Sequence, residues 1–565
     1  MFSIACKVGG AFTEAEIEGF RGLNKALKFF HHYKDTSSFC HFDLLIKHSG
    51  KLDNIFSKSK HGEETIILVG FPKLKSLTDN FYSTVDGFFI GFHLSSNFIR
   101  AIRDPVGSRA LYYASKCEYF YFASEIRTFK AFEGVSIEPR KEAIAEYLSF
   151  SFIPGTNTFL ESIYEISLGS YLELRENSVA QIDYCNYHKK ENEWVDFDEG
   201  EMKEAFSHAL DNSTKICRSI FPEDPVFFLS GGLDSSSILA IAVKEHLKSK
   251  PLTLSVNFGK DLPNENEFID MIVDQHQTDH NYLEITPKLF IESISEIFTH
   301  IDDPIGDPVV VPNYLMNQYL GGRNKFIFTG EGGDPCLGGP KNKAMLMARF
   351  YGPGFGLNED NYLEISYLNS FKRCFDDLYL AIPNQFANST EKMVEFLKPY
   401  LRNPDLSEFT NRIMLSNIKL KATSLIMPKV QKTTMAFGNI SVSPLYTREF
   451  IEASMKVPPS YKLAKGDEKF ILKQCMEGLV PNDVITRPKS GMRVPLRIWS
   501  SDELIKFYKD YLLSNRQTIS NWIDFDYIKM LLSIKHTEKN ITRIGLKLWM
   551  ITSLFHYLEN ITRNE

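Results

Sequence analysis

The chain has 565 residues, of which 43% are hydrophobic and 24% are charged. This composition is typical of a folded protein and excludes a chain that is mostly disordered. The 64 basic and 71 acidic residues give a net charge of −7. That balance argues against nucleic acid as the main partner, because phosphate binding relies on clustered lysine and arginine. No stretch approaches the roughly 18 apolar residues of a membrane-spanning helix, so we expect no membrane span.

The eight cysteines are scattered and form no C-x-x-C pair, so we expect reduced thiols rather than a disulfide framework or a zinc site. The N-terminal segment 1–4 lacks the charged region and the apolar core of a signal peptide. Both features predict a cytoplasmic protein. His31 and His32 would point about 100° apart on a helix, and we interpret them as structural residues. The sequence leaves the oligomeric state open.

The polar run 188–201 predicts a boundary between two domains, residues 1–195 and 196–565. Before it, the apolar runs 87–93, 111–113 and 119–123 are separated by turns and indicate a domain built on sheets. After it, a helical stripe begins at Met202 and Phe206. The short apolar strands 226–229, 252–258 and 325–328 then alternate with helices such as 238–243. This alternation predicts a parallel sheet covered on both faces.

Beyond about Ala344 the strand signals fade, and helices dominate the rest of the chain. The final helix carries an apolar stripe that we interpret as core, because it is too short for a coiled coil. The stripe consists of Ile544, Leu548, Ile551, Phe555 and Leu558.

The strongest motif is a glycine-rich turn between an apolar strand and a helix. It reads Ser230-Gly231-Gly232-Leu233-Asp234-Ser235-Ser236. Two glycines let the backbone approach a ligand closely, and backbone N–H groups beside a helix N-terminus favour an anion. The serine hydroxyls add donors for phosphate oxygens. Asp234 fits such a site if it binds Mg²⁺, which bridges phosphates, whereas a turn with capping serines leaves Asp234 unexplained. The motif is neither a Walker A loop nor a dinucleotide fingerprint.

A second glycine-rich loop, Thr329-Gly330-Glu331-Gly332-Gly333-Asp334, follows the strand 325–328. It too lies at the carboxyl end of a strand, where open α/β sheets bind ligands. We therefore expect Asp234 and Asp334 to share one or two Mg²⁺ ions, and Glu331 to be a candidate general base. By itself the loop would be read as an acidic surface turn.

The segment 229–236 is similar to the pyrophosphate-loop motif of ATP pyrophosphatases, and the chain as a whole resembles the glutamine-dependent asparagine synthetase family. Matching segments fall in the family's order along both domains. They are 103–107, 111–113, 123–125, 147–155 and 163–171, followed by 302–304, 329–334, 435–436, 443–445, 468–472 and 487–491. The resemblance implies an α/β fold: an Ntn-hydrolase-like β-sandwich layered with helices, then a doubly wound parallel sheet with the pyrophosphate loop and a helical C-terminal part.

The resemblance also implies a reaction. The family's synthetase domain transfers AMP from ATP to a carboxylate, pyrophosphate leaves, and an amine attacks the acyl-adenylate. Lys469 would then stabilise negative charge on the leaving group, Glu331 would take a proton from the amine, and Asp234 and Asp334 would bind Mg²⁺. The residues expected to bind ATP are Leu229, Ser230, Gly231, Gly232, Leu233, Asp234, Ser235, Ser236, Val256, Thr329, Gly330 and Lys489.

The N-terminal domain departs from the family pattern. The family's glutaminase uses a cysteine as residue 2, whose free amine and thiolate act on glutamine. This chain has Phe2, and the nitrogen of Cys6 is tied in a peptide bond. The family's Arg-Gly-Pro-Asp and Asn-Gly-Glu-Ile-Tyr-Asn strings, which hold glutamine, are also missing. We expect a domain that keeps its shape and has lost glutaminase activity.

The segment 430–447 departs as well. Family members carry several charged residues where this chain has Gln431, Ile440, Val442 and Thr447. A pocket for free aspartate needs a cation for the α-carboxylate and partners for the ammonium group. The exchange predicts a larger or less polar substrate.

Relatives without the cysteine include β-lactam synthetases and the macrolactam synthetases of lasso peptide pathways, which close an amide within one molecule. The former place a tyrosine in the second glycine-rich loop, where this chain has Glu331. A lasso-type macrolactam synthetase is therefore the leading expectation, with a small-molecule or peptide carboxylate as substrate and a precursor peptide and its protease as partners. The alternatives are an asparagine synthetase that uses free ammonia and an inactive nucleotide-binding homologue. The presence of Asp234, Asp334 and Lys469 together disfavours the inactive homologue.

Overall fold

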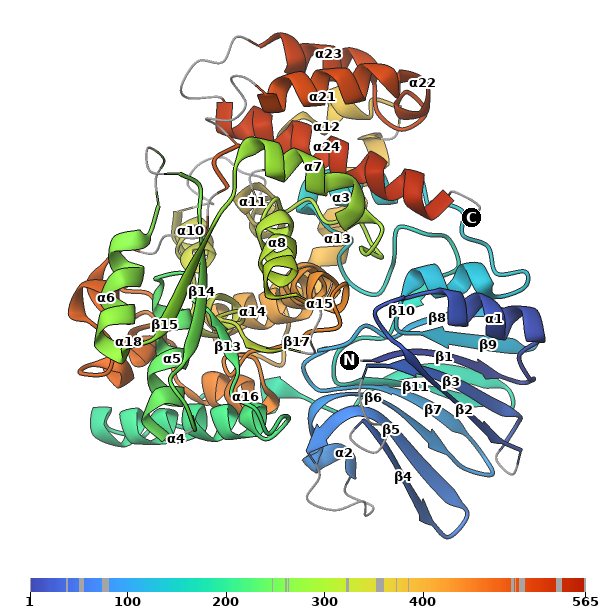
Figure 1. Cartoon of the computed structure of the whole chain (residues 1–565), viewed down its shortest axis with the longest axis horizontal. Helices are drawn as coiled ribbons and strands as arrows, with labels where there is room; N and C mark the ends of the chain where they lie inside the picture. The colour runs from blue at the N-terminus through green and yellow to red at the C-terminus, as the bar shows by residue number, and fades with distance from the viewer. Residues whose placement is uncertain are drawn as a thin grey trace.

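The structure is a computed structural model that describes most of the chain. The described residues are 2–36, 39–49, 55–73, 81–245, 247–259, 262, 264–321, 325–351, 360–371, 373–384, 386–488, 492, 494–496, 503–534 and 541–562. Among these residues, no helix is long and apolar enough to cross a membrane. Figure 1 shows the N-terminal sheets at the lower right, a third sheet with its helices at the left, and a group of C-terminal helices at the top.

The N-terminal half is a sandwich of two antiparallel six-stranded sheets. The first sheet has the order β10 (Tyr164–Glu165), β8 (Tyr112–Lys116), β9 (Tyr119–Ala123), β1 (Phe2–Val8), β3 (Phe42–His48) and β2 (Phe29–Asp35). The second has the order β12 (Ser178–Asp183), β11 (Ser170–Arg175), β7 (Ile99–Arg103), β6 (Asp86–Leu94), β5 (Glu64–Lys73) and β4 (Phe56–His61). Side chains alternate between the faces of a strand, so Ile4 and Cys6 of β1 pack between the sheets while Ala5 packs on the outer layer. That layer includes α1 (Glu14–Gly22) and α3 (Ala143–Phe150).

The two histidines lie on strand β2 rather than on a helix, which corrects the premise of the sequence argument. Consecutive side chains on a strand point to opposite faces. His32 Nε2 lies 2.5 Å from Asp43 Oδ1, whereas the ring of His31 packs against Phe56. The two imidazoles therefore face different surroundings, and their interpretation as structural residues is unchanged.

The third sheet is entirely parallel and has the order β15 (Asp279–Glu284), β14 (Leu252–Asn257), β13 (Val226–Phe228), β16 (Phe326–Phe328) and β17 (Ile440–Val442). On one face, α8 (Val310–Leu320) packs Met316 against Val226 and Leu254. The other face carries α4 (Glu199–Arg218), α5 (Leu233–Glu245), α6 (Asn266–His276), α16 (Arg448–Lys456) and α18 (Phe470–Met476). Helices thus cover both faces, and the predicted doubly wound sheet is confirmed.

Helices make up most of the chain beyond the second glycine-rich loop. The main ones are α9 (Gly333–Leu337), α10 (Pro340–Tyr351), α11 (Tyr362–Ser370), α13 (Phe386–Leu401), α14 (Phe409–Ser416), α15 (Met427–Met435), α21 (Glu503–Ser514), α23 (Phe525–Ser533) and α24 (Ile541–Thr562). The stripe predicted for the last helix is buried along its whole length in α24. Among the described residues beyond Ala344, strand β17 departs from the predicted loss of strands, because three residues are too few for a period to show. The predicted boundary at residue 195 lies between β12 and α4.

Candidate active site

A cavity of about 850 Å³ opens where β13, β14 and β16 end and α8 and α15 face them. Most residues predicted to bind ATP or act in catalysis line it. They are Leu229, Ser230, Gly232, Asp234, Ser235, Val256, Thr329, Gly330, Glu331 and Asp334. Gly231 and Ser236 belong to the same turn but do not line the cavity. Leu233 and Lys469 line a small adjoining pocket that shares Gly232 with it, and Lys489 lies outside the described residues.

The first glycine-rich turn is held by its own serines. Ser235 Oγ accepts a hydrogen bond of 3.1 Å from the backbone N–H of Ser230 and lies 3.1 Å from Ser230 Oγ. Gly231 has φ +67°, a left-handed conformation that glycine adopts without a Cβ penalty. The turn leads directly into α5, so the N-terminus of that helix faces the cavity. Backbone N–H groups at such a helix start are a favourable site for phosphate.

Lys469 connects the two glycine-rich loops. Its Nζ lies 2.6 Å from Asp234 Oδ2 and 2.5 Å from Asp334 Oδ1. The Lys469 side chain is only 4% exposed, whereas that of Asp334 is 36% exposed toward the cavity. Lys469 also has φ 58°, a left-handed conformation rare for a residue with a Cβ. A strained backbone at a charged residue is a common feature of functional sites, where the surrounding contacts hold it in place.

Two glycines allow the loops to approach each other. A Cβ on Gly333 would lie 2.5 Å from Asp234 Oδ1, and a Cβ on Gly330 would lie 2.8 Å from the backbone nitrogen of Ser235. The carboxylates of Asp234 and Asp334 both contact Lys469 Nζ, so they lie close together at the end of the sheet. Mg²⁺ prefers carboxylate and phosphate oxygens, and usually binds through one or two carboxylates plus substrate phosphates. The two aspartates are a donor set that fits this ion.

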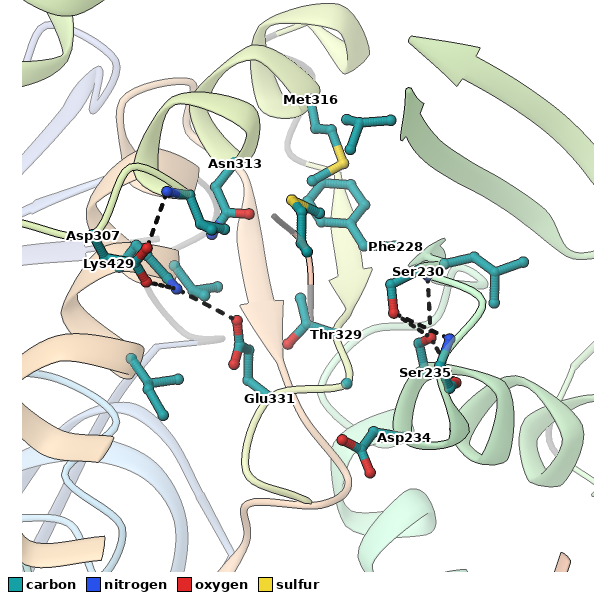
Figure 2. A pocket seen from close by; sticks show the side chains of 18 of the residues that line it. Phe228, Ser230, Asp234, Ser235, Asp307, Asn313, Met316, Thr329, Glu331 and Lys429 are labelled. Atoms are coloured by element: carbon teal, nitrogen blue, oxygen red, sulfur yellow. Dashed lines mark hydrogen bonds and ion pairs between the residues drawn. The ribbon is translucent and has the colours of Figure 1, made fainter. Parts of the chain in front are cut away.

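Across the cavity from the first turn lies a second charged group, which the sequence analysis missed (Figure 2). Lys429 Nζ donates a hydrogen bond of 2.9 Å to Asp307 Oδ2 and lies 4.0 Å from Glu331 Oε1. Burial would lower the pKa of Lys429, but Asp307 and Glu331 raise it above its ordinary value. Lys421 also lines this wall, and burial lowers its pKa. The wall therefore offers both charges to a substrate.

The positions of Lys421 and Lys429 depend on an unusual helix. Residues Asn417–Ile426 form a π-helix that joins α14 to α15 without a break. A π-helix has more residues per turn than an α-helix, is rare, and is frequently found at functional sites. No sequence period used for the α-helix identifies it, but two lysines eight residues apart in a segment without any acidic residue are a signal that could have been noticed.

The four positions of segment 430–447 at which the sequence departs from the family pattern do not line the cavity. Ile440 and Val442 are buried in β17, and the Thr447 hydroxyl accepts the backbone N–H of Phe450 at the start of α16. Gln431 is also absent from the cavity lining. The prediction of a larger or less polar substrate therefore has no support from positions in the cavity, whose far wall carries the charges of Asp307, Lys421 and Lys429.

Comparison with known proteins agrees with this geometry. The family model Asparagine synthase matches residues 206–552, and a Glutamine amidotransferase domain model matches residues 73–185. A glutamine-hydrolysing asparagine synthetase 1 of Bacillus subtilis is 27% identical over 479 residues, which are 80% of this chain and 74% of that protein. Asparagine synthetase 3 of the same organism is 24% identical and covers 70% and 64% of the two chains.

A carboxyethyl-arginine beta-lactam-synthase of Streptomyces clavuligerus is 27% identical over 336 residues, which are 59% of this chain and 52% of that protein. The Asparagine synthase match spans more than half of the chain and includes both glycine-rich loops, Lys429 and Lys469. The chain therefore belongs to the asparagine synthase family and is an ATP-dependent carbon–nitrogen ligase.

Proposed function

We propose that this ligase adenylates a carboxylate with ATP, releases pyrophosphate, and joins the acyl-adenylate to an amine of the same molecule. The observation that carries the adenylation step is the convergence of Asp234, Lys469 and Asp334 beside the glycine-rich turn. A cation held by two carboxylates at the helix start can stabilise the charge that develops on pyrophosphate as it leaves. Asp234 and Asp334 would hold Mg²⁺, which supplies further positive charge to the phosphates when it is bound.

The second half-reaction needs a base. Glu331 projects into the cavity from the loop after β16, between the turn and the wall formed by Lys429 and Asp307. Its carboxylate is 31% exposed and is therefore open to a ligand. In this proposal it takes the proton that the amine loses as the C–N bond forms and AMP departs.

The source of the amine follows from the N-terminal half. Cys6 is fully buried in β1, and burial raises the pKa of its thiol well above its ordinary value, so it carries no thiolate for attack on glutamine. An amine that is not released from glutamine has to come with the substrate or from solution. A relative named for making a β-lactam supports the first route, since a lactam is an amide closed within one molecule. We propose a lasso-type macrolactam as the product class.

A second candidate is an asparagine synthetase that uses free ammonia. The pairing of Lys429 with Asp307 favours it, because the α-carboxylate and ammonium groups of aspartate need opposite charges close together. In this case the substrate carboxylate would enter beside Lys421, and ammonia would attack from solution.

ATP–pyrophosphate exchange separates the two candidates. The full chain is incubated with ATP, Mg²⁺ and labelled pyrophosphate, first with aspartate and then with short peptides bearing an internal aspartate or glutamate. Exchange with the peptides and none with aspartate supports ring closure. Exchange with aspartate, together with formation of asparagine when ammonia is added, contradicts ring closure and supports the second candidate.

The variant Asp234→Ala tests the adenylation site in either case and is expected to abolish exchange. Asp274→Asn, on the exposed surface of α6, is the matched control and should leave exchange unchanged. Full exchange by Asp234→Ala would contradict the proposed Mg²⁺ and phosphate site.

A further inference from the structure

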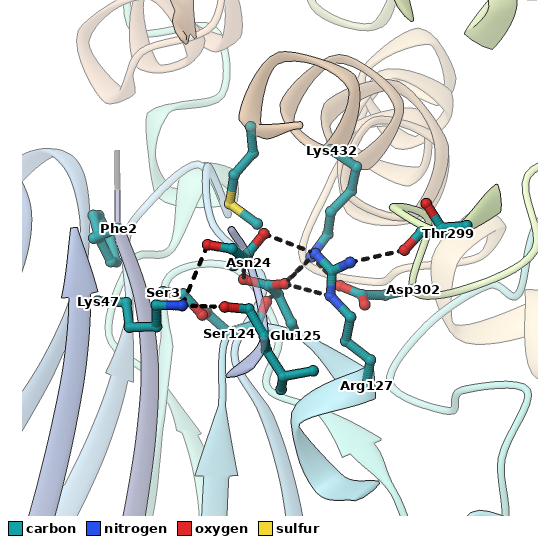
Figure 3. A network of polar contacts seen from close by, with 12 residues as sticks. Phe2, Ser3, Asn24, Lys47, Ser124, Glu125, Arg127, Thr299, Asp302 and Lys432 are labelled. Atoms are coloured by element: carbon teal, nitrogen blue, oxygen red, sulfur yellow. Dashed lines mark hydrogen bonds and ion pairs between the residues drawn. The ribbon is translucent and has the colours of Figure 1, made fainter. Parts of the chain in front are cut away.

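The N-terminal sheets carry a buried network of charges beside Phe2, the position discussed above for the missing nucleophile (Figure 3). Glu125, two residues after β9, receives hydrogen bonds of 2.8 and 2.6 Å from Arg127 Nε and Nη2. Asn24 donates to the other oxygen of Glu125. Lys47 is held by the backbone carbonyls of residues 21, 23 and 24. Glu125, Asn24 and Arg127 thus bond to one another, whereas Lys47 bonds to the backbone beside them.

The network continues across to the ligase half at two points. Arg127 Nη1 donates a 2.8 Å hydrogen bond to the carbonyl of Thr299, where α7 (Pro287–Phe298) ends. Lys432 of α15 donates to the carbonyl of Ser124 at 3.3 Å and also to Asp302 Oδ2. Ser124 and Asp302 are 1% and 2% exposed, and Lys432 is 3% exposed. All three groups are therefore removed from water.

The buried ion pair of Lys432 and Asp302 joins the same two segments as the ion pair of Lys429 and Asp307 at the cavity wall. Lys432 lies three residues after Lys429 on α15, and Asp302 lies five residues before Asp307 on the segment between α7 and α8. The same two segments are thus joined twice, once by Lys432–Asp302 and once by Lys429–Asp307. The carbonyl of Ser124 contacts the first pair. The N-terminal half also reaches the segment that carries Asp302 and Asp307, because the Phe159 N–H donates to Asp303 Oδ1 and the Ser151 carbonyl accepts from the Gly306 N–H.

We propose that Lys432 and Asp302 are positioning residues: held by the N-terminal sheets, their ion pair fixes α15 against the segment 302–309 and thereby places Lys429 and Asp307 at the cavity wall. On this view the N-terminal half of the chain serves as a support for the substrate-binding wall of the ligase. The inference rests on the proposed function only in that the wall is taken to bind the carboxylate substrate.

Two measurements on the full chain test it, and the first does not require activity. Hydrogen–deuterium exchange of Lys432→Met and Asp302→Asn is followed by mass spectrometry in peptides covering 302–309 and 427–435. We expect exchange to accelerate by about tenfold in these two segments, while the β13–β14 region keeps its protection. Lys432→Arg, which retains the charge, should restore most of the protection.

The second measurement is the kinetics of ATP–pyrophosphate exchange with the accepted carboxylate. Both variants should raise the KM for the carboxylate by about tenfold and leave the KM for ATP unchanged, because the glycine-rich turn lies on the opposite wall. Arg448→Met is the matched control. Arg448 of α16 joins the two halves by a 2.9 Å hydrogen bond to the carbonyl of Val85, on elements other than α15.

If Arg448→Met accelerates hydrogen–deuterium exchange in residues 427–435 as much as Lys432→Met does, the effect is a general loosening of the contact between the two halves. The proposal is then overturned. Unchanged hydrogen–deuterium exchange of segments 302–309 and 427–435 in Asp302→Asn also overturns the proposal. If Lys432→Met does not fold, the result for Asp302→Asn alone tests the positioning role. A wild-type chain that shows no pyrophosphate exchange with any carboxylate contradicts the proposed function instead, and the deuterium measurement still decides the positioning role.

Discussion

Two ion pairs join α15 to the segment before α8, and they differ in what surrounds them. Lys432 and Asp302 have side chains that are 4% and 2% exposed and are closed off by the N-terminal sheets. Lys429 is similarly buried at 6%, but Asp307 is 20% exposed and faces the cavity with Glu331. A lysine–aspartate pair therefore holds two segments together in one place and forms part of the substrate-binding wall in the other. Access to the cavity, and not the type of residue, separates the two roles.

The largest effect is expected at Lys469, which lies beside the cavity and contacts the two aspartates at the phosphate end. Lys469→Ala removes the cation that contacts Asp234 and Asp334, and should lower kcat for pyrophosphate exchange by about 10²- to 10³-fold. Lys473→Ala, one turn later on α18 and paired with Asp467, is the control and should retain activity. A Lys469→Ala enzyme within a few fold of wild type would show that this lysine only fastens the loops, as Lys432 fastens α15.

A smaller effect, on stability rather than catalysis, is expected in the closed network. Burial would raise the pKa of Glu125, but Arg127 and Lys432 lower it to about 2 from an ordinary 4.5. A carboxyl with a lowered pKa stabilises the fold above its unfolded pKa, and this contribution is lost as the pH falls from about 4.5 toward 2. The shift corresponds to about 3 kcal/mol.

Glu125→Gln should therefore be less stable than wild type at pH 7, and the difference should narrow as the pH falls below 4.5. Urea denaturation of both proteins between pH 7 and pH 3 measures it. Glu118→Gln, at an exposed turn, is the control and should follow wild type at each pH. A stability difference that stays constant through this range would contradict the ionised state assigned to Glu125.

The comparison also explains what the sequence could and could not predict. The parallel sheet, the two glycine-rich loops and the buried stripe of α24 follow from local patterns, and the cavity brings together most of the residues chosen from the two loops. Lys429 and Asp307 are 122 residues apart, and the ion pair between them depends on how α15 packs against α8. Comparison with the family pattern placed Ile440 and Val442 in the substrate pocket, whereas in the structure they belong to the edge strand β17. Local periods do not report such tertiary contacts.

The smallest effect concerns the reaction that we expect the N-terminal half to have lost. Purified protein should release no more glutamate from glutamine than buffer does, and Cys6→Ala should leave that value unchanged. The reason is structural: Cys6 lies between the two sheets with a neutral thiol, and the charges of the neighbouring network are occupied by one another. If the protein releases glutamate steadily and Cys6→Ala abolishes the release, glutamine can reach the buried N-terminal network. The network beside Phe2 would then be a binding site and not a support for the ligase half.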